Sequence, residues 1–268
     1  IGAYATAILT KTYGVSWPVS FLVSGGLAFA VGVVLGFPAL RVKFHYLAFV
    51  TLAFAMFVYL VAKNEEWLTG GVYGFSNIPR PVIFGIDLSR GLPFYRFVLV
   101  VTLVLSLAMW WLLRSPWGRA FLALRENWMR AASLGVDIRT YTLLAFAIGS
   151  AWGGFAGALY APLVEFIDPA PFAISASFVL LLTVVVGGSG FFLGPFVGSF
   201  LSFVLPELLR VTGGWYLLVY ASTVLIILLI CPTGLLGLVE RGREALSQRR
   251  AAALRAEARP LLEGSEAR

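Results

Sequence analysis

The sequence is poor in charged residues, cysteine and histidine. Only 12% of its 268 residues are charged and 60% are hydrophobic, against roughly a quarter and a half in soluble proteins. It has one cysteine, Cys231, and one histidine, His45, so an intrachain disulfide, a multi-cysteine metal site and a histidine cluster are excluded. The composition is that of a membrane protein, and it predicts neither a metal nor a cofactor.

Motifs that carry chemistry are also missing. No G-x-x-x-x-G-K-[ST] loop occurs, so the chain does not cradle nucleotide phosphates by that mechanism. No Ser/His/Asp constellation is evident, because His45 lies beside Lys43 and is better explained as an interfacial side chain. No signal-peptide pattern is visible either. We therefore expect a protein that is not an enzyme.

Long uncharged runs predict the membrane spans. Five are plain, at residues 18–36, 45–62, 97–113, 141–164 and 215–231. Residues 172–206 also lack charge, but as one helix they would be about 52 Å long against a hydrocarbon core of about 30 Å. The glycines and proline of GGSGFFLGP, residues 187–195, predict a break there. We expect an all-α polytopic membrane protein, a transmembrane helix bundle with short or broken helices around the GGSG turn and seven crossings.

The two ends of the sequence differ in composition. The first ten residues, IGAYATAILT, lack an initiator methionine and form an apolar run that is too short to cross a bilayer. We interpret them as part of a span, so that residues 1–239 form a transmembrane domain incomplete at its N-terminus. Residues 240–268 are rich in arginine and are interpreted as a basic tail.

Lysine and arginine are distributed unevenly between the two sides of the predicted bundle. One side has fourteen, namely Arg41, Lys43, Arg114, Arg119, Arg125, Arg130, Arg139 and the seven arginines of the tail. The other has six, namely Lys11, Lys63, Arg80, Arg90, Arg96 and Arg210. The positive-inside rule makes the first side, with the C-terminus, cytoplasmic. The net charge of +7 is thus mostly explained by the membrane topology. It is compatible with binding of anionic lipid, and no nucleic-acid partner is expected.

Asp, Glu, Lys and Arg are absent from the central parts of the predicted spans. Proton pumps, ion-coupled carriers and voltage sensors usually need such residues at membrane depth. The pattern therefore argues against transport powered by the chain itself.

Small residues instead recur every fourth position on three predicted helices. The sets are Gly149, Gly153 and Gly157; Gly190, Gly194, Gly198 and Ser202; and Ser24, Ala28, Gly32 and Gly36. Such faces let helix backbones approach closely in lipid. They either pack a compact bundle, which is the simpler interpretation, or let helices slide during a transport cycle. Gly187, Gly188 and Pro195, at the predicted break, belong to the same packing or gating set.

Residues 115–137 predict an amphipathic helix on the cytoplasmic side. Ser115 and Pro116 begin it, Gly135 ends it, and Asp137 caps the next helix. Its apolar face has Phe121, Leu124, Trp128 and Ala131, and its polar face has Arg119, Glu126, Arg130 and Ser133. Glu126 and Arg130 stand four apart, in the order that favours pairing. The helix either lies in the lipid headgroup layer or offers a docking surface, and its pattern alone leaves both open.

Five blocks of sequence resemble the LivM-type permease subunits of bacterial branched-chain amino-acid ABC importers. The longest, residues 115–161, begins SPWGRAFLALRENWMRAASLGVDIRTYTLL. The others are FPALRVKFHYLAFVTLAFA (37–55), LTGGVYGFSNIP (68–79), VVGGSGFFLGPFVGSF (185–200) and CPTGLLGL (231–238). The blocks follow the family order over nearly the whole chain, and together they are specific.

The resemblance implies that about residues 116–135 form a coupling helix, which inserts into a groove of an ATPase subunit. The residues assigned to this contact are Arg125, Glu126, Asn127, Trp128, Arg130, Ala131, Ala132 and Gly135. The chain departs from the family pattern at Trp128 and Met129, where relatives often have an acidic or smaller residue. It also departs at His45, where glycine is common.

The resemblance further implies a permease subunit of an ATP-driven importer for branched-chain or related amino acids, in the bacterial cytoplasmic (inner) membrane. Its implied partners are a homologous LivH-like permease, two cytoplasmic LivG- and LivF-like ATPases and an external solute-binding protein. The loop from Lys63 to Arg96, with Gly70, Gly71 and Gly74, would dock the binding protein, or is an ordinary connection. By resemblance, further spans would precede Ile1.

Other functions stay open at the level of the sequence. Similar permeases carry urea, short amides or aromatic acids, and the substrate-binding residues of this chain are not predicted. An uncoupled channel or facilitator is an alternative from another class, and a structural membrane scaffold is a third.

Overall fold

The computed structural model describes residues 1–40, 44–83, 86–87, 91–209 and 234–237, with positions 222, 225 and 229. The helices are α1 (Gly2–Lys11), α2 (Trp17–Ala39), α3 (Phe44–Asn64), α4 (Glu66–Thr69), η1 (Gly71–Tyr73), α5 (Leu92–Arg114), α6 (Pro116–Glu126), α7 (Trp128–Ser133), α8 (Ile138–Val164), η2 (Ala170–Phe172), α9 (Ile174–Gly187) and α10 (Gly194–Leu209). Two short strands, β1 (Val82–Ile83) and β2 (Ile86–Asp87), pair antiparallel. The chain divides into two compact units, Ile1–Ile174 and Ser175–Arg268.

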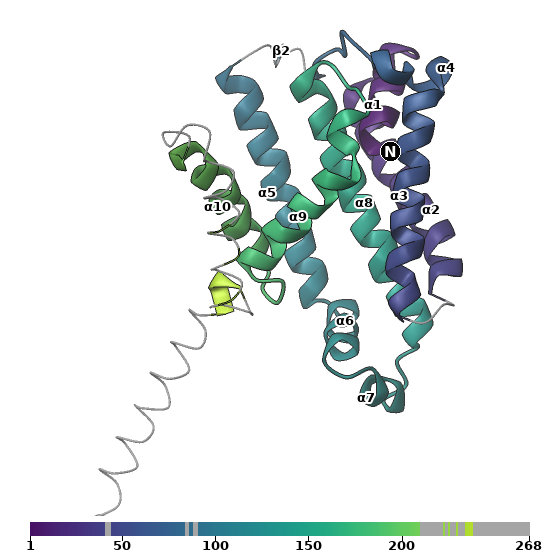
Figure 1. Cartoon of the computed structure of the whole chain (residues 1–268), viewed down its shortest axis with the longest axis vertical. Coiled ribbons are helices and arrows are strands. Elements are labelled where there is room, and N and C mark those ends of the chain that lie inside the picture. Colours follow the sequence, from purple (N-terminus) through teal and green to yellow (C-terminus); the bar gives the residue numbers. More distant parts are fainter. Residues whose placement is uncertain are drawn as a thin grey trace, which may run out of the picture. The chain divides into compact units, whose positions relative to one another are not determined.

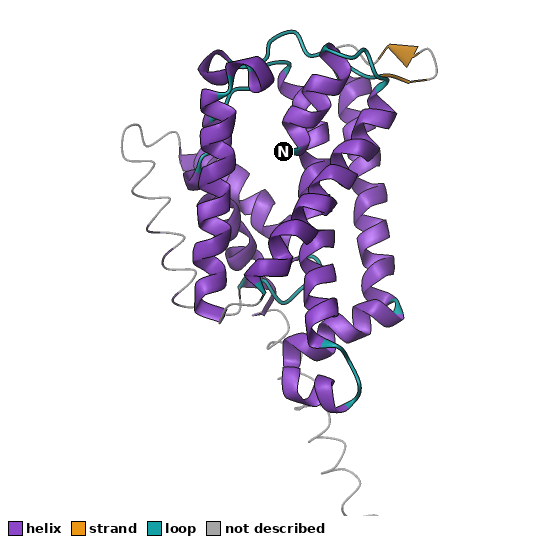
Figure 2. Ribbon diagram, turned by 90° about the vertical axis from the view of Figure 1, so that its right-hand side faces the viewer, coloured by secondary structure: helices purple, strands orange, loops and turns teal. Residues whose placement is uncertain are grey.

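Four helices of the first unit are long and apolar enough to cross a membrane, over Trp17–Ala39, Tyr46–Asn64, Leu92–Arg114 and Ile138–Val164. They run lengthwise between two ends of this unit, with β2 and α4 at one end and α6 and α7 at the other (Figures 1 and 2). Four of the five plain predicted spans, and the expected all-α class, are confirmed. The fifth span, residues 215–231, and the tail, residues 240–268, fall outside the described residues except for single positions.

Helices α2 and α8 pack along a seam of small residues. On α2 the seam contains Ser24, Ala28, Gly32 and Gly36, which are buried, as their four-residue spacing predicts. Opposite Ala28, a methyl group at Gly154 would overlap the Ala28 Cβ and the Ser24 carbonyl oxygen. The two backbones therefore approach as closely as the absence of side chains allows.

The seam on α8 differs from the predicted one. Its buried residues are Ala147, Ala151, Gly154, Ala158, Leu159, Ala161 and Pro162. A Cβ at Gly149 or Gly153 would meet no atom within 4 Å in the described part of the chain, whereas one at Gly157 would meet the backbone of Ala3. Within the described part of the chain, Gly149 and Gly153 therefore lie off the packed side of α8, where buried residues from Ala147 to Ala161 recur in alternating steps of four and three. The gating role of these glycines stays a prediction.

The second unit contains the predicted break, which is confirmed. Helix α9 ends at Gly187 and α10 begins at Gly194 with Pro195 in its first turn. Gly188 has φ +115°, a conformation that glycine adopts without a Cβ penalty. A Cβ at Gly198 would overlap the Thr183 carbonyl oxygen, so α9 and α10 pack backbone to backbone beyond the turn.

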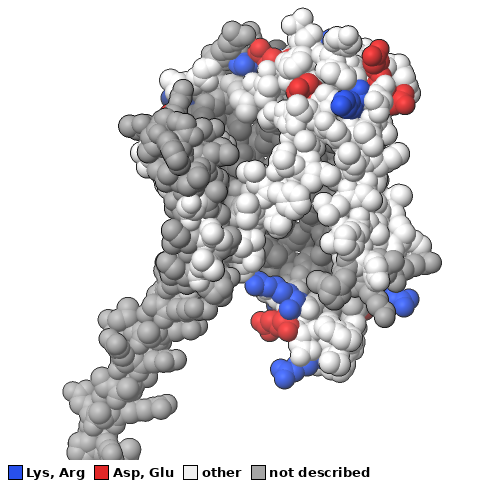
Figure 3. Space-filling model, viewed as in Figure 1, with Lys and Arg blue, Asp and Glu red and all other residues white. Residues whose placement is uncertain are grey.

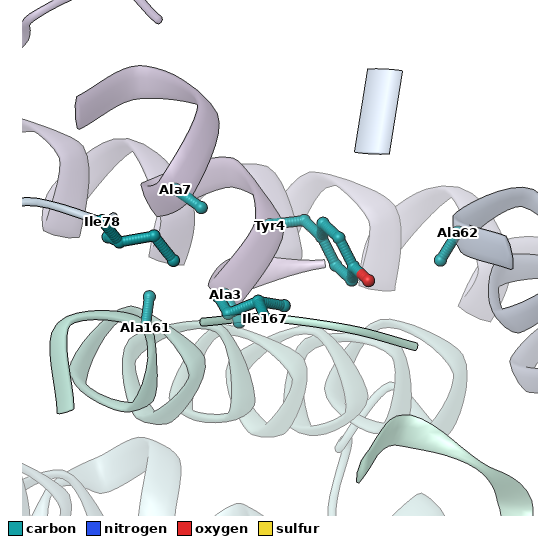
Figure 4. Close-up of a cluster of buried hydrophobic side chains, with 7 residues drawn as sticks. All are labelled: Ala3, Tyr4, Ala7, Ala62, Ile78, Ala161 and Ile167. Atoms are coloured by element: carbon teal, nitrogen blue, oxygen red, sulfur yellow. The ribbon is translucent and has the colours of Figure 1, made fainter. Parts of the chain in front are cut away.

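A cluster of buried side chains holds the α4 end of the first unit together. It consists of Ala3, Tyr4 and Ala7 from α1, Ala62 from α3, Ala161 from α8, and Ile78 and Ile167 from the connecting loops (Figure 4). Ile78 is 3% exposed and Ile167 1% exposed. These two loops are therefore anchored on the helix bundle by apolar burial.

Candidate functional site

The predicted amphipathic helix is two helices, α6 and α7, joined at Asn127. Asn127 has an extended backbone, φ −158° and ψ 103°, and its Oδ1 accepts hydrogen bonds from the N–H groups of Met129 and Arg130, each at 3.1 Å. The prediction of one continuous helix is wrong because this asparagine caps α7 with its side chain instead of extending α6. Glu126 and Arg130 now lie on either side of the break, so the predicted pairing along one helix does not apply.

The α6–α7 hairpin, residues 116–133, is fixed at both ends by the caps that the sequence predicts. The Ser115 side chain accepts from the Gly118 N–H at 3.4 Å. Gly135 has φ +84°, which allows the sharp turn after α7. Asp137 caps α8 by accepting from the Arg139 N–H at 3.0 Å.

Asp137 also carries a perturbed carboxylate. Its Oδ2 accepts a hydrogen bond from the Thr140 hydroxyl at 2.6 Å. This bond, with the bonds from the Arg139 and Thr140 backbone, lowers the pKa of the Asp137 carboxyl although desolvation opposes the shift. The cap is therefore ionised at neutral pH, as a helix N-terminus favours.

The residues assigned to ATPase coupling lie together on the hairpin and its exit turn, at the end of the first unit opposite α4 (Figure 1). Ala131 is buried and Asn127 half-buried, whereas Arg125, Glu126, Trp128, Arg130, Ala132 and Gly135 are exposed. Trp128 is 60% and Met129 63% exposed, although the sequence places Trp128 on the apolar face. The hairpin thus presents charged and aromatic side chains together.

The opposite end of the unit carries the loop that the sequence predicts for docking. Gly70, Gly71 and Gly74 have φ values of +73°, +57° and +66°, which favour glycine. Gly74 also lies against the Ile167 carbonyl oxygen, and the next residue, Phe75, exchanges backbone hydrogen bonds with Ile167 at 2.7 and 2.9 Å. These glycines therefore shape the loop through their backbones.

An ion pair that the sequence did not predict braces this loop. Arg80 Nε donates to Glu165 Oε1 at 2.6 Å, and the Arg80 guanidinium lies over the Phe94 ring, 5.0 Å from its centroid. Glu165 has φ +60°, an uncommon conformation for a non-glycine residue. The two partners are 85 residues apart, so no local pattern signals them. In the same loop, between Lys63 and Arg96, Trp67 and Tyr73 are 81% and 83% exposed.

A cavity of about 430 Å³ lies among α1, α2, α3 and α8. It is lined by small and apolar residues, including Gly32, Phe54, Gly153 and Gly154, with hydroxyls from Thr51 and Ser150. Both hydroxyls donate to carbonyl oxygens of their own helices, Thr51 to Ala48 and Ser150 to Phe146. The lining therefore suits a small aliphatic group better than an ion.

Charge is confined to the ends of the face shown in Figure 3. Lysine, arginine, aspartate and glutamate gather at the α4 end and around the α6–α7 hairpin, and the described surface between them is uncharged. Among the described residues no group of three His, Cys, Asp or Glu side chains could hold a metal ion. A charge-free band between two charged ends is the surface of a membrane-spanning bundle.

The geometry is that of an integral membrane protein with a hairpin at one end of its spans. A comparison with a protein-family model identifies its relatives. The model of the branched-chain amino acid transport system permease component matches residues 1–232. The chain belongs to this family of permeases, and it is a multi-pass membrane protein.

Curated relatives support the same assignment. Over 259 residues the chain is 36% identical to the high-affinity branched-chain amino acid transport system permease protein LivM of Escherichia coli (strain K12) and 34% identical to that of Salmonella typhimurium, covering 88% of this chain and 61% of each relative. It is 27% identical over 227 residues to the autoinducer 2 import system permease protein LsrC of Yersinia pestis, covering 78% of this chain and 62% of the relative. The chain thus spans about three fifths of these relatives. No solved structure matches it.

Proposed function

We propose that the chain is a permease subunit of an ATP-driven importer for branched-chain or related amino acids. The observation that carries the proposal is the α6–α7 hairpin, which is ordered by the Ser115, Asn127 and Asp137 caps while its charged side chains stay exposed. A hairpin that transmits movement from an ATPase to the membrane spans must be rigid and must leave one face exposed for that partner. The central parts of the four described spans contain no ionisable residue, which fits energy supplied by another subunit.

The partners in this proposal are a homologous second permease subunit, two cytoplasmic ATPases and an external solute-binding protein, in the bacterial cytoplasmic membrane. The ATPases would contact the hairpin and move it when they close. The solute-binding protein would dock at the opposite end, where Trp67 and Tyr73 are exposed and the Arg80–Glu165 pair links two loops. The solute's aliphatic part would pass the cavity beside Gly153.

Reversing one charge on the hairpin tests the proposal. In an ATPase groove, Glu126→Arg would leave charge unpaired at a partly buried contact, which costs several kcal/mol and lowers affinity more than tenfold. Glu66→Arg is the matched control, because Glu66 is also exposed but lies in α4 at the other end. We expect both variants to insert, and only Glu126→Arg to lose ATPase co-purification and solute-stimulated ATP hydrolysis.

Full ATPase binding and stimulation by Glu126→Arg would contradict the coupling role, and α6–α7 would then be a membrane-surface element. Solute uptake without ATP would instead favour a facilitator. Uptake of urea, short amides or aromatic acids in place of branched-chain amino acids would keep the importer and change its substrate.

The sidedness of the hairpin is tested separately by labelling. Ser133 is exposed at the end of α7, so a cysteine there can react with a maleimide. We expect an impermeant maleimide to label Ser133→Cys in inside-out vesicles and not in intact cells. Labelling in intact cells would invert the topology.

A further inference from the structure

Two adjacent glycines of α8 lie in different surroundings. A Cβ at Gly154 would overlap the Ala28 side chain of α2, whereas a Cβ at Gly153 would meet no atom within 4 Å in the described part of the chain. Glycine is less favourable than alanine inside a helix. Close packing therefore accounts for Gly154, but contacts among the described residues do not explain why position 153 lacks a side chain.

Gly153 instead lies on the wall of the cavity of about 430 Å³ among α1, α2, α3 and α8. A cavity of this size falls within the roughly 300–1,000 Å³ of ligand pockets. Because Gly153 lines the cavity and its Cβ position is open, a side chain there would take up part of that space. The absence of a side chain at position 153 thus keeps the cavity at its full volume.

The lining of the cavity favours aliphatic groups. It includes Val31, Leu35 and Phe54, and it contains no Asp, Glu, Lys or Arg side chain. The hydroxyl hydrogens of Thr51 and Ser150 are used in bonds to carbonyl oxygens of their own helices, so neither hydroxyl is free to donate to a carboxylate. A charged group would lose its hydration here without gaining a partner of opposite charge.

The cavity lies well inside the apolar length of the spans. Gly153 is near the middle of α8 (Ile138–Val164), and Phe54 is near the middle of α3 (Phe44–Asn64). Both helices are long and apolar enough to cross a membrane. The cavity therefore offers an apolar group a place at membrane depth, far along the chain from the charged ends of these helices.

We propose that Gly153 selects solutes by size, at a cavity that receives the aliphatic side chain of the imported solute. This inference rests on the proposed import function and adds a point of selection within the membrane spans. A lipid chain would also suit the apolar lining, but a lipid in the cavity would not make uptake depend on the size of the solute. That dependence is what the experiment measures.

Graded filling of the cavity tests the proposal. Gly153→Ala and Gly153→Val are assembled with the partner subunits in vesicles, and ATP-driven uptake of L-leucine and L-alanine is compared with that of the unmodified importer. Each methylene without room in an apolar site lowers affinity about fourfold. We expect Gly153→Val to lower the ratio of leucine to alanine uptake by about tenfold, and Gly153→Ala to lower it less.

The matched control is Gly26→Val on α2. Gly26 is exposed and lies inside a helix, its Cβ would meet no atom within 4 Å in the described part of the chain, and it does not line the cavity. This variant should leave the uptake ratio within twofold of the unmodified importer. An equal fall in the ratio for Gly26→Val and Gly153→Val would overturn the proposal, because added helix volume alone would then explain it.

A second-site change provides the rescue. Phe54 lines the same cavity from α3, so Phe54→Ala combined with Gly153→Val should restore most of the leucine uptake. Equal loss of leucine and alanine uptake in Gly153→Val, without rescue, would mark a packing contact of Gly153 with protein or lipid and overturn the proposal. If the unmodified importer shows no ATP-driven uptake, the proposed function itself is contradicted, and this inference fails with it.

Discussion

The α2–α8 seam and the α6–α7 hairpin are ordered by opposite means. In the seam, Ser24 and Ala147 are completely buried and glycines bring the backbones into contact. In the hairpin, the only buried residues are Gly118 and Ala131, and hydrogen-bonded caps define the helices. The seam therefore contributes to the stability of the bundle, whereas the hairpin keeps its surface available.

The seam and the hairpin are expected to tolerate different substitutions. Added volume is most damaging in the seam, because nothing there can move aside without separating two spans. In the hairpin, added volume meets solvent, and the sensitive groups are the few that hold the chain's turns. Stability and function are thus expected to respond to different residues.

The largest effect is expected from two neighbouring glycines. Gly154→Leu would force apart α2 and α8, because the Ala28 Cβ and the Ser24 carbonyl occupy the space that a side chain needs. Overpacking of this kind costs about 1–3 kcal/mol or more, and we expect loss of folded protein on size-exclusion chromatography. Gly153→Leu projects beside the cavity, with no atom within 4 Å of its Cβ, and should fold. Equal yields of the two would contradict the seam.

An intermediate effect is expected from a buried hydroxyl pair at the α1–α2 contact. Thr6 Oγ1 and Ser24 Oγ are 2.7 Å apart and both residues are completely buried. Thr6→Val or Ser24→Ala leaves one hydroxyl without its partner, at a cost of about 1 kcal/mol in a membrane protein. A double-mutant cycle of unfolding free energies should give a coupling of about that size. Additive losses would show that the hydrogen bond contributes nothing to stability.

The smallest effect on global stability is expected at Asn127. Asn127→Ala removes the side-chain cap of α7, which typically stabilises a helix by about 1 kcal/mol. The loss should be local, visible as faster amide hydrogen exchange at Met129 and Arg130 with an unchanged melting temperature. Asn127→Asp keeps an acceptor oxygen and should retain the protection. Uniform acceleration across α8 would contradict a local role.

The sequence predicted the turns and helix caps of this structure, which depend on neighbouring residues. The glycines and Pro195 marked the break between α9 and α10, and Ser115 and Asp137 marked two helix starts, because turns and caps depend on a few adjacent residues. The break at Asn127 was not predicted. Asparagine is only mildly unfavourable within a helix. Whether Asn127 continues α6 or caps α7 therefore depends on its surroundings.

Contacts between residues far apart in the chain could not be predicted from the sequence. Because Gly153 and Gly154 are adjacent, either one could belong to a small-residue face of α8. Only the position of α2 shows that Gly154 is the glycine packed against it. Arg80 and Glu165 meet because two distant loops cross at Ile167. The contact between the Phe121 and Tyr141 rings, whose centroids are 6.1 Å apart, likewise depends on how α6 lies against α8.

The contact between the hairpin and an ATPase is the central claim, and photo-crosslinking tests it most directly. A benzoylphenylalanine replaces Met129, which is 63% exposed on α7, or Tyr73, which is 83% exposed at the opposite end. On illumination of membranes that contain the assembled importer, we predict that position 129 captures the ATPase subunit and position 73 does not. Capture of lipid alone at position 129, or of the ATPase at position 73, would contradict the account.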